Sequence, residues 1–263
     1  MKKKFIKRTI TSVLLTLFVG VAGIVTLVLH PQVLFAHQLE HRHFSIYSEV
    51  PINENIKQIL DSAERMVMSS ELHDAGYKYD IFLCHGTAFN KLDDWLLGSW
   101  PAARAIDNNV IIKVPVDIGD GTAENGENEF HLDYMFAHEM VHCLQANHYG
   151  KLTFNPLSHP PMWKLEGYPE YISRQKRREP DNYNLMDEIN LFLEKTNESS
   201  QNIDIIQLDR TTSVPYIYFK GRLMVEYLMD IKNWSYDDIL QEKIKEEQVW
   251  KELLEWHQNE IEQ

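Results

Sequence analysis

The pattern of apolar and polar positions separates an N-terminal apolar run from a longer chain in which the two alternate. The run from Ile10 to Leu29 contains no charged residue. A helix of that length spans about 30 Å, the thickness of the hydrocarbon core of a bilayer. Further on, Pro51 opens a segment with helical periodicity from Ile52 to Ser70, and Tyr79 to Cys84 predicts a β-strand.

After residue 130 the spacing of apolar positions is typical of helices. The segment from Phe130 to Asn147 has a broad apolar surface, as expected for a helix in a protein core. Three further helices are predicted over Tyr183 to Thr196, Phe219 to Asp230 and Tyr236 to His257. Because strands precede the helix at 130–147 and only helices follow it, the sequence predicts an α+β fold.

The basic flank of the apolar run predicts how the chain meets a membrane. Lys2, Lys3, Lys4, Lys7 and Arg8 precede the run, and such a flank keeps the N-terminus cytoplasmic. We expect a cytoplasmic tail over 1–9, a transmembrane signal anchor over 10–29, a juxtamembrane segment over 30–50 and one outward-facing domain over 51–263. The alternative is a cleaved signal with a secreted domain, because Leu34-Phe35-Ala36 offers a small residue for cleavage.

The net charge of the region after the apolar run limits which partners it can bind. Five of the 26 basic residues lie in the first eight positions, so the rest of the chain has 21 basic and 39 acidic residues. An acidic surface repels nucleic acid, and we exclude nucleic acid as a partner. The two cysteines, Cys84 and Cys143, are interpreted as packed core residues, although an outward location permits a disulfide.

The segment His138-Glu139-Met140-Val141-His142 is a candidate metal-binding motif. On a helix the two histidines lie one turn apart on the same face, where both rings reach one metal ion. A catalytic zinc takes three protein ligands and leaves one position for water. We expect His138, His142 and Glu166 as the metal ligands, and Glu139 beside them. With 12 histidines in the chain the five-residue pattern alone also fits a solvated amphipathic helix.

A second motif favours the metal interpretation. The segment Trp163 to Tyr171 reads W-K-L-E-G-Y-P-E-Y and resembles the W-x-x-E-G-x-x-E-Y segment of the gluzincin zinc peptidases, the thermolysin-like group. The resemblance implies a zincin-like fold over 51–263, a zinc ion with Glu166 as its third ligand, and Glu170 as the carboxylate that orients a ligand histidine. Pro169 departs from the small residue common there. Since proline is tolerated in a first turn, we expect the helix to begin close to Glu166.

The implied reaction is hydrolysis of a peptide bond in a peptide or protein substrate. The zinc lowers the pKa of its bound water, and Glu139 acts as the general base. The segment Pro215 to Leu228 is similar to a downstream gluzincin helix that carries an oxyanion-stabilising tyrosine. Tyr218 is our first choice for that role and Tyr216 our second; both are equally compatible with packing in the core.

The same residues bear on other metal-binding patterns and on another function. The metzincin pattern places a third histidine at His148 but requires glycine where Gln145 stands. A metal site with a purely structural role normally has four protein ligands, and the sequence shows no suitable fourth ligand. A catalytically inactive zincin-fold protein that binds a partner or serves membrane assembly is the alternative function. For substrate binding we expect the strand Val110 to Val114 at the sheet edge and a mobile loop over Gly119 to Asn128.

Overall fold

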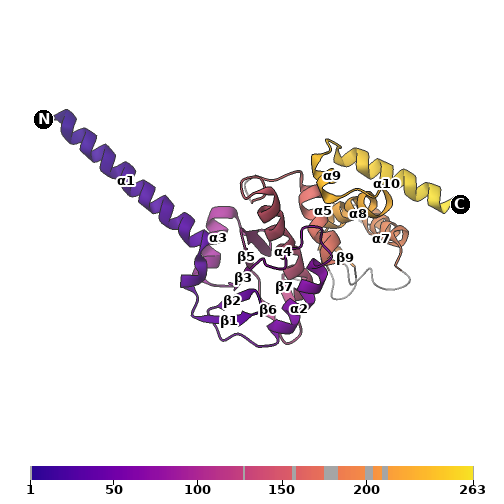
Figure 1. Ribbon diagram of the computed structural model, residues 1–263, viewed down its shortest axis with the longest axis horizontal. Helices are drawn as coiled ribbons and strands as arrows, with labels where there is room; N and C mark the ends of the chain where they lie inside the picture. The colour runs from indigo at the N-terminus through magenta and orange to yellow at the C-terminus, as the bar shows by residue number, and fades with distance from the viewer. Residues whose placement is uncertain are drawn as a thin grey trace.

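The computed structural model describes residues 2–126, 128–155, 158–174, 183–198, 204–208 and 213–262. Figure 1 shows helix α1 (Lys2–Leu29) extending away from a folded body in which the strands lie nearer to α1 and the C-terminal helices lie on the far side. The fold is mixed α+β, as predicted. Within α1, Thr9–Leu29 is long and apolar enough to cross a membrane.

A five-stranded sheet forms the N-terminal half of the body. Its order is β1 (His37–His41), β2 (Phe44–Ser48), β3 (Tyr79–Leu83), β5 (Asn109–Ile112) and β4 (Ala103–Ile106). The three central strands are parallel, and the edge strands β1 and β4 are antiparallel to their neighbours.

This sheet changes two expectations from the sequence. Residues 37–48 belong to the folded domain, so a boundary at residue 51 is too late: Phe44 and Ile46 are fully buried, because β2 pairs with β3 inside the sheet. The strand predicted at 110–114 is also an interior strand. The sheet edge beside α4 is formed by β4, whose short alanine-containing sequence gave no clear strand pattern.

Both faces of the sheet are covered, which explains the continuous apolar sequence of β5. Successive side chains of a strand point to opposite faces. Ile81 therefore packs with α2 (Ile56–Val67) and α4 (Leu132–Tyr149), whereas Phe82 packs with α3 (Ala88–Leu97). The end of α1 joins the α3 side through Val28.

A small three-stranded antiparallel sheet precedes the central helix α4. It consists of β6 (Val116–Asp117), β7 (Thr122–Asn125) and β8 (Asn128–His131). The predicted mobile loop at 119–128 is therefore largely a hairpin, with Glu127 outside the described residues. Ala123 is fully buried and attaches the hairpin to the core. Because the residues around it are mostly polar, no sign of this contact is visible in the sequence.

The C-terminal half is mainly helical. It contains α5 (Met162–Ser173), α7 (Leu185–Glu198), α8 (Tyr216–Glu226), the π-helical turn η2 (Tyr227–Ile231), α9 (Tyr236–Gln241) and α10 (Glu246–Ile261), with the short strand pair β9 (Ile205–Gln207) and β10 (Ser213–Pro215). The helix expected over 236–257 is divided into α9 and α10. Helix α9 ends at Glu242, where the backbone becomes extended, and the Glu242 carbonyl accepts a hydrogen bond from Lys164 Nζ.

The two cysteines are buried free thiols, as the sequence predicted. Cys84 Sγ lies 3.1 Å from the carbonyl oxygen of Ile112, to which it donates a hydrogen bond. Burial raises the Cys84 pKa to about 12.

Candidate metal centre

Helix α4 carries two histidines whose rings meet above its surface. His138 and His142 lie one turn apart, and their Nε2 atoms are 3.2 Å from each other. Most side chains of α4 are buried, because the helix runs between the large sheet and α5. Its apolar surroundings fix the helix, so the two rings keep a common orientation.

Glu166 completes a triad of ligand atoms. Its Oε2 lies 3.1 Å from His138 Nε2 and 3.2 Å from His142 Nε2. The three ligand atoms thus converge on one point, and the group could hold a metal ion. The structure brings together all three residues that the sequence selected as ligands.

Helix α5, which carries Glu166, begins earlier than Pro169 suggested. It starts at Met162, so Glu166 lies in the second turn and Pro169 is inside the helix. A proline there has no N–H for the carbonyl four residues earlier, that of Leu165. The helix continues because another group hydrogen-bonds this carbonyl.

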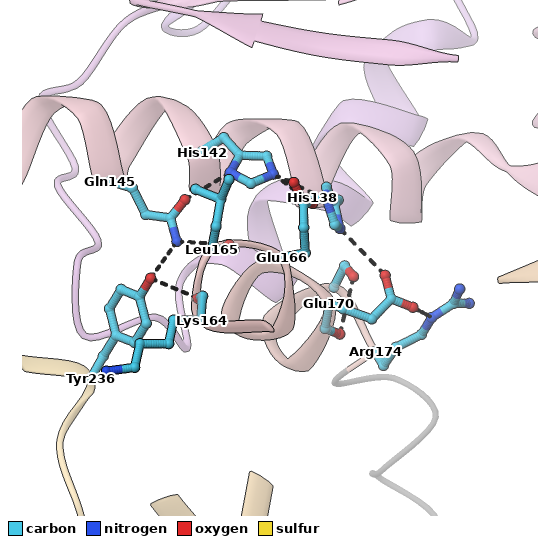
Figure 2. A network of polar contacts seen from close by, with 10 residues as sticks. His138, His142, Gln145, Lys164, Leu165, Glu166, Glu170, Arg174 and Tyr236 are labelled. Atoms are coloured by element: carbon cyan, nitrogen blue, oxygen red, sulfur yellow. Dashed lines mark hydrogen bonds and ion pairs between the residues drawn. The ribbon is translucent and has the colours of Figure 1, made fainter. Parts of the chain in front are cut away.

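That group is the side chain of Gln145, on α4. Its Nε2 donates to the Leu165 carbonyl over 3.1 Å and to the Tyr236 hydroxyl over 2.7 Å. With both amide hydrogens used, Oε1 faces His142 Nδ1 at 2.7 Å and accepts its hydrogen bond. Figure 2 shows this network. In the sequence, Gln145 stands out only as the residue where the metzincin pattern has glycine, and no signal marks Tyr236, because α9 is distant along the chain.

The other histidine is held by a carboxylate, as the resemblance implied. Glu170 Oε2 lies 3.3 Å from His138 Nδ1, and Glu170 Oε1 accepts a hydrogen bond of 2.6 Å from Arg174 Nε. Each ring therefore has an acceptor on its Nδ1 side and directs Nε2 toward Glu166. Neutral imidazoles fixed in this way are suited to bind a cation.

The charges of the metal-free triad are strongly coupled. Burial by itself disfavours a charged His138 ring, but its hydrogen bonds to Glu166 and Glu170 outweigh burial and raise the His138 pKa to about 10. Burial would raise the Glu170 pKa, but the positive charges of Arg174 and His138 and their hydrogen bonds lower it to about 2. In the absence of a metal, a proton on His138 balances these carboxylates.

Glu139 lies beside the triad at the junction of two pockets. It is buried, and burial is the main cause of its raised pKa. One pocket of about 190 Å³ extends past His142 and Gln145 toward Phe154. The other, of about 90 Å³, extends past His138 along the first turns of α4. Because Glu139 lines both, its carboxylate faces a cleft that passes over the triad.

Of the two tyrosines expected to act in catalysis, only Tyr218 reaches this cleft. It lines both pockets and stacks on His138, with ring centroids 5.2 Å apart. Burial and then the negative charges of Glu166 and Glu139 raise its pKa well above 10, so it remains an O–H donor. Tyr216 lines neither pocket and packs against Phe192 in the core.

Two glycines allow α8 to bring Tyr218 to the triad. A Cβ on Gly167 of α5 would lie 2.5 Å from the carbonyl oxygen of Gly221 in α8, and one on Gly221 would lie 3.1 Å from the carbonyl oxygen of Trp163. The first contact excludes a side chain at Gly167 unless the helices shift, and the second is tight. The glycine that follows Glu166 in the sequence motif is therefore a packing requirement.

Strand β4 borders the cleft opposite α5. Ala103 lines both pockets and Ala105 lines the larger one, together with Trp100 and Pro101 from the preceding loop. The backbone of Ala102 pairs with Lys113. Because paired residues alternate along an antiparallel ladder, the peptide groups of Ala103 and Ala105 face the open edge.

Comparisons of the chain with protein-family models, curated proteins and solved structures find no match. What the site can do therefore follows from its own geometry: two histidines and a glutamate that could hold a metal ion, with a second glutamate and a tyrosine in the cleft beside them.

Proposed function

We propose that this chain is a zinc-dependent peptidase of the gluzincin type. The observation that carries the proposal is the convergence of His138, His142 and Glu166 on one point, with Glu139 beside them in an open cleft. A site built only to bind a metal needs no carboxylate of this kind next to its ligands.

Zinc suits the donor set. Two imidazole nitrogens and one carboxylate oxygen are the ligands of many catalytic zinc sites, which leave the fourth position open. Among the described residues, no further histidine, cysteine or acid joins the group of three. A closed four-ligand site with a purely structural role has less support, because the ligands border a cleft.

The chain's own side chains supply the remaining chemistry. A zinc ion held by His138, His142 and Glu166 would supply Lewis-acid chemistry: it would lower the pKa of a water molecule and polarise the substrate carbonyl. Glu139 accepts the proton of the attacking water and delivers it to the leaving nitrogen. Its raised pKa, caused by burial, makes it a better base than an exposed glutamate. Tyr218 donates its O–H to the oxyanion that develops on the carbonyl.

A peptide substrate suits the open edge of β4. An extended segment can add to an exposed strand through main-chain hydrogen bonds, without need of a specific side chain. The free peptide groups of Ala103 and Ala105 lie along the cleft that contains Glu139. An antiparallel edge strand beside the helix with the two histidines also supports the zincin-like assignment.

We further propose that α1 anchors the domain on the outer side of the cell membrane. Its apolar side chains from Ile10 to Val25 are largely exposed. Its last turn is fixed to the domain, because Asn109 Nδ2 donates a hydrogen bond of 3.0 Å to the Leu29 carbonyl and Val28 joins the apolar cluster around Phe82. A cleaved signal would leave Asn109 without this partner.

The test compares the full-length protein, in detergent, with three variants on a casein digest and a peptide library. Glu139→Gln should abolish hydrolysis and keep about one zinc per chain, whereas Glu166→Ala should lose most of the metal. Glu124→Gln, an exposed acid outside the cleft, is the matched control and should match the parent. Parent-like cleavage by Glu139→Gln would exclude the mechanism. Zinc binding without cleavage by the parent would favour the inactive alternative.

A further inference from the structure

The smaller of the two pockets beside the metal centre, which we name the Arg174 pocket, contains a buried cation. It is lined by the beginning of α4, the end of α5 and β10, and it shares Glu139 and Tyr218 with the larger pocket. Its walls include Phe130, Tyr134 and Met135. A group bound here would lie directly next to the point where Glu139 acts.

Arg174 uses only a small part of its hydrogen-bonding capacity. The residue is 6% exposed. Its Nε donates to Glu170, and its guanidinium carbon lies 4.9 Å from the centre of the Tyr134 ring. In the described part of the chain no partner is found for its two terminal nitrogens. Figure 2 shows these nitrogens pointing away from the Glu170 carboxylate.

The charges around the pocket leave this end of the guanidinium available. Glu170 is already engaged by Arg174 Nε and by the His138 ring. Glu139 is the other acid of the lining, and His131, Asn125 and Ser213 add neutral or basic polar groups. A guanidinium carries five N–H donors in a planar fork that matches a carboxylate. Arg174 lines the pocket, so its terminal N–H donors are open to a carboxylate that enters it.

We propose that the Arg174 pocket binds a carboxylate of the substrate through the terminal nitrogens of Arg174. This inference rests on the proposed peptidase function and gives it a substrate class: peptides that present a carboxylate next to the scissile bond. That carboxylate comes either from an acidic side chain or from the C-terminus of the chain. The first source describes an endopeptidase with acidic specificity, and the second a carboxypeptidase.

The experiment measures binding, so that it does not depend on turnover. Full-length Glu139→Gln protein loaded with zinc is titrated calorimetrically with short acetylated peptides. One pair is tetra-alanine with a free carboxylate or with an amide at its C-terminus. The other pair, amidated, carries glutamate or glutamine at an internal position. We expect one carboxylate peptide to bind about 10- to 100-fold more tightly than its neutral match, the range for charge-assisted hydrogen bonds.

The same titrations with Arg174→Met added identify the residue responsible. In Arg174→Met the affinities for the carboxylate peptide and its neutral match should differ by less than about twofold, and the affinity for neutral peptides should not change. Arg174→Lys should restore part of the preference for the carboxylate peptide. The proposal is overturned if no carboxylate peptide is preferred, or if the preference survives in Arg174→Met. It is also overturned if Arg174→Met loses zinc and all peptides equally, because Arg174 then only supports Glu170. A parent that binds carboxylate peptides without cleaving any would contradict the peptidase alone.

Discussion

The side chain of Gln145 takes the place of a backbone N–H that Pro169 cannot provide. Its Nε2 donates to the Leu165 carbonyl over 3.1 Å, within a helix whose next turn carries the proline. The same amide accepts from His142 Nδ1 through Oε1. Gln145 therefore joins α4 to α5 and fixes the orientation of the His142 ring.

This relationship predicts that Gln145 controls metal affinity. Gln145→Leu removes the acceptor of His142 Nδ1 and leaves the Leu165 carbonyl unpaired, so zinc affinity should fall by about 10- to 100-fold. Tyr236→Phe should weaken it less, because Gln145 keeps its other partners. Chelator competition on the folded protein measures both.

The control is Tyr149→Phe, which removes a hydroxyl that bonds to Asp237 outside this network. It should leave zinc affinity unchanged. A Gln145→Leu protein that is folded and binds zinc within twofold of the parent would contradict the role of Gln145.

The metal-free protein should be most stable in mildly acidic solution. The His138 pKa is raised from 6.5 to about 10, so its stabilising contribution is complete below pH 6.5 and is lost as the pH rises through 10. The Glu170 pKa is lowered from 4.5 to about 2, so its contribution is complete above pH 4.5 and is lost as the pH falls through 2. The optimum therefore lies between pH 4.5 and 6.5.

Melting temperatures recorded in chelator across this range measure the effect. Glu170→Gln removes one cause of the raised His138 pKa, so its alkaline loss of stability should begin at lower pH. Bound zinc would take the place of the proton on His138, so added zinc should stabilise the protein more at high pH than at low pH. A melting temperature in chelator that does not change between pH 6.5 and 10 would exclude this coupling.

Gly167→Ala should destabilise the protein although alanine favours helices. The new Cβ would lie 2.5 Å from the backbone oxygen of Gly221, which cannot rotate away. We expect a loss of about 1–3 kcal/mol in the free energy of unfolding, as for other overpacked contacts. Because α8 carries Tyr218, hydrolysis should fall as well.

Denaturant unfolding measures the cost. Gly76→Ala is the matched control, since its Cβ would meet only an Asp74 side-chain oxygen at 3.4 Å. It should change stability by less than about 0.5 kcal/mol. Equal stability of the two variants would show that α5 and α8 can separate without cost.

Features that depend on local spacing could be predicted from the amino-acid sequence alone. A helix places residues four apart on one face, so His138 and His142 were recognisable as a pair. The roles of Glu166 and Glu170 came from the resemblance of their segment to the gluzincin motif. The α+β order and the apolar run at 10–29 were likewise readable, because periodicity and length are local properties. The family, the zinc and the reaction remain predictions that the experiments above test.

The groups that complete the site from distant parts of the chain became apparent from the folded structure. Gln145 and Tyr236 are 91 positions apart, and Arg174 acquires its pocket through contacts between α4, α5 and β10. Three predictions from the sequence were wrong: the edge position of the strand at 110–114 in place of β4, the exclusion of residues 37–48 from the domain, and the start of the helix that contains Pro169. Each of these depends on a partner supplied by packing: an edge to pair with, a sheet to join, or a side chain to replace a missing N–H. Such partners leave no periodic signal in the segment itself, because the compensating group lies elsewhere in the chain.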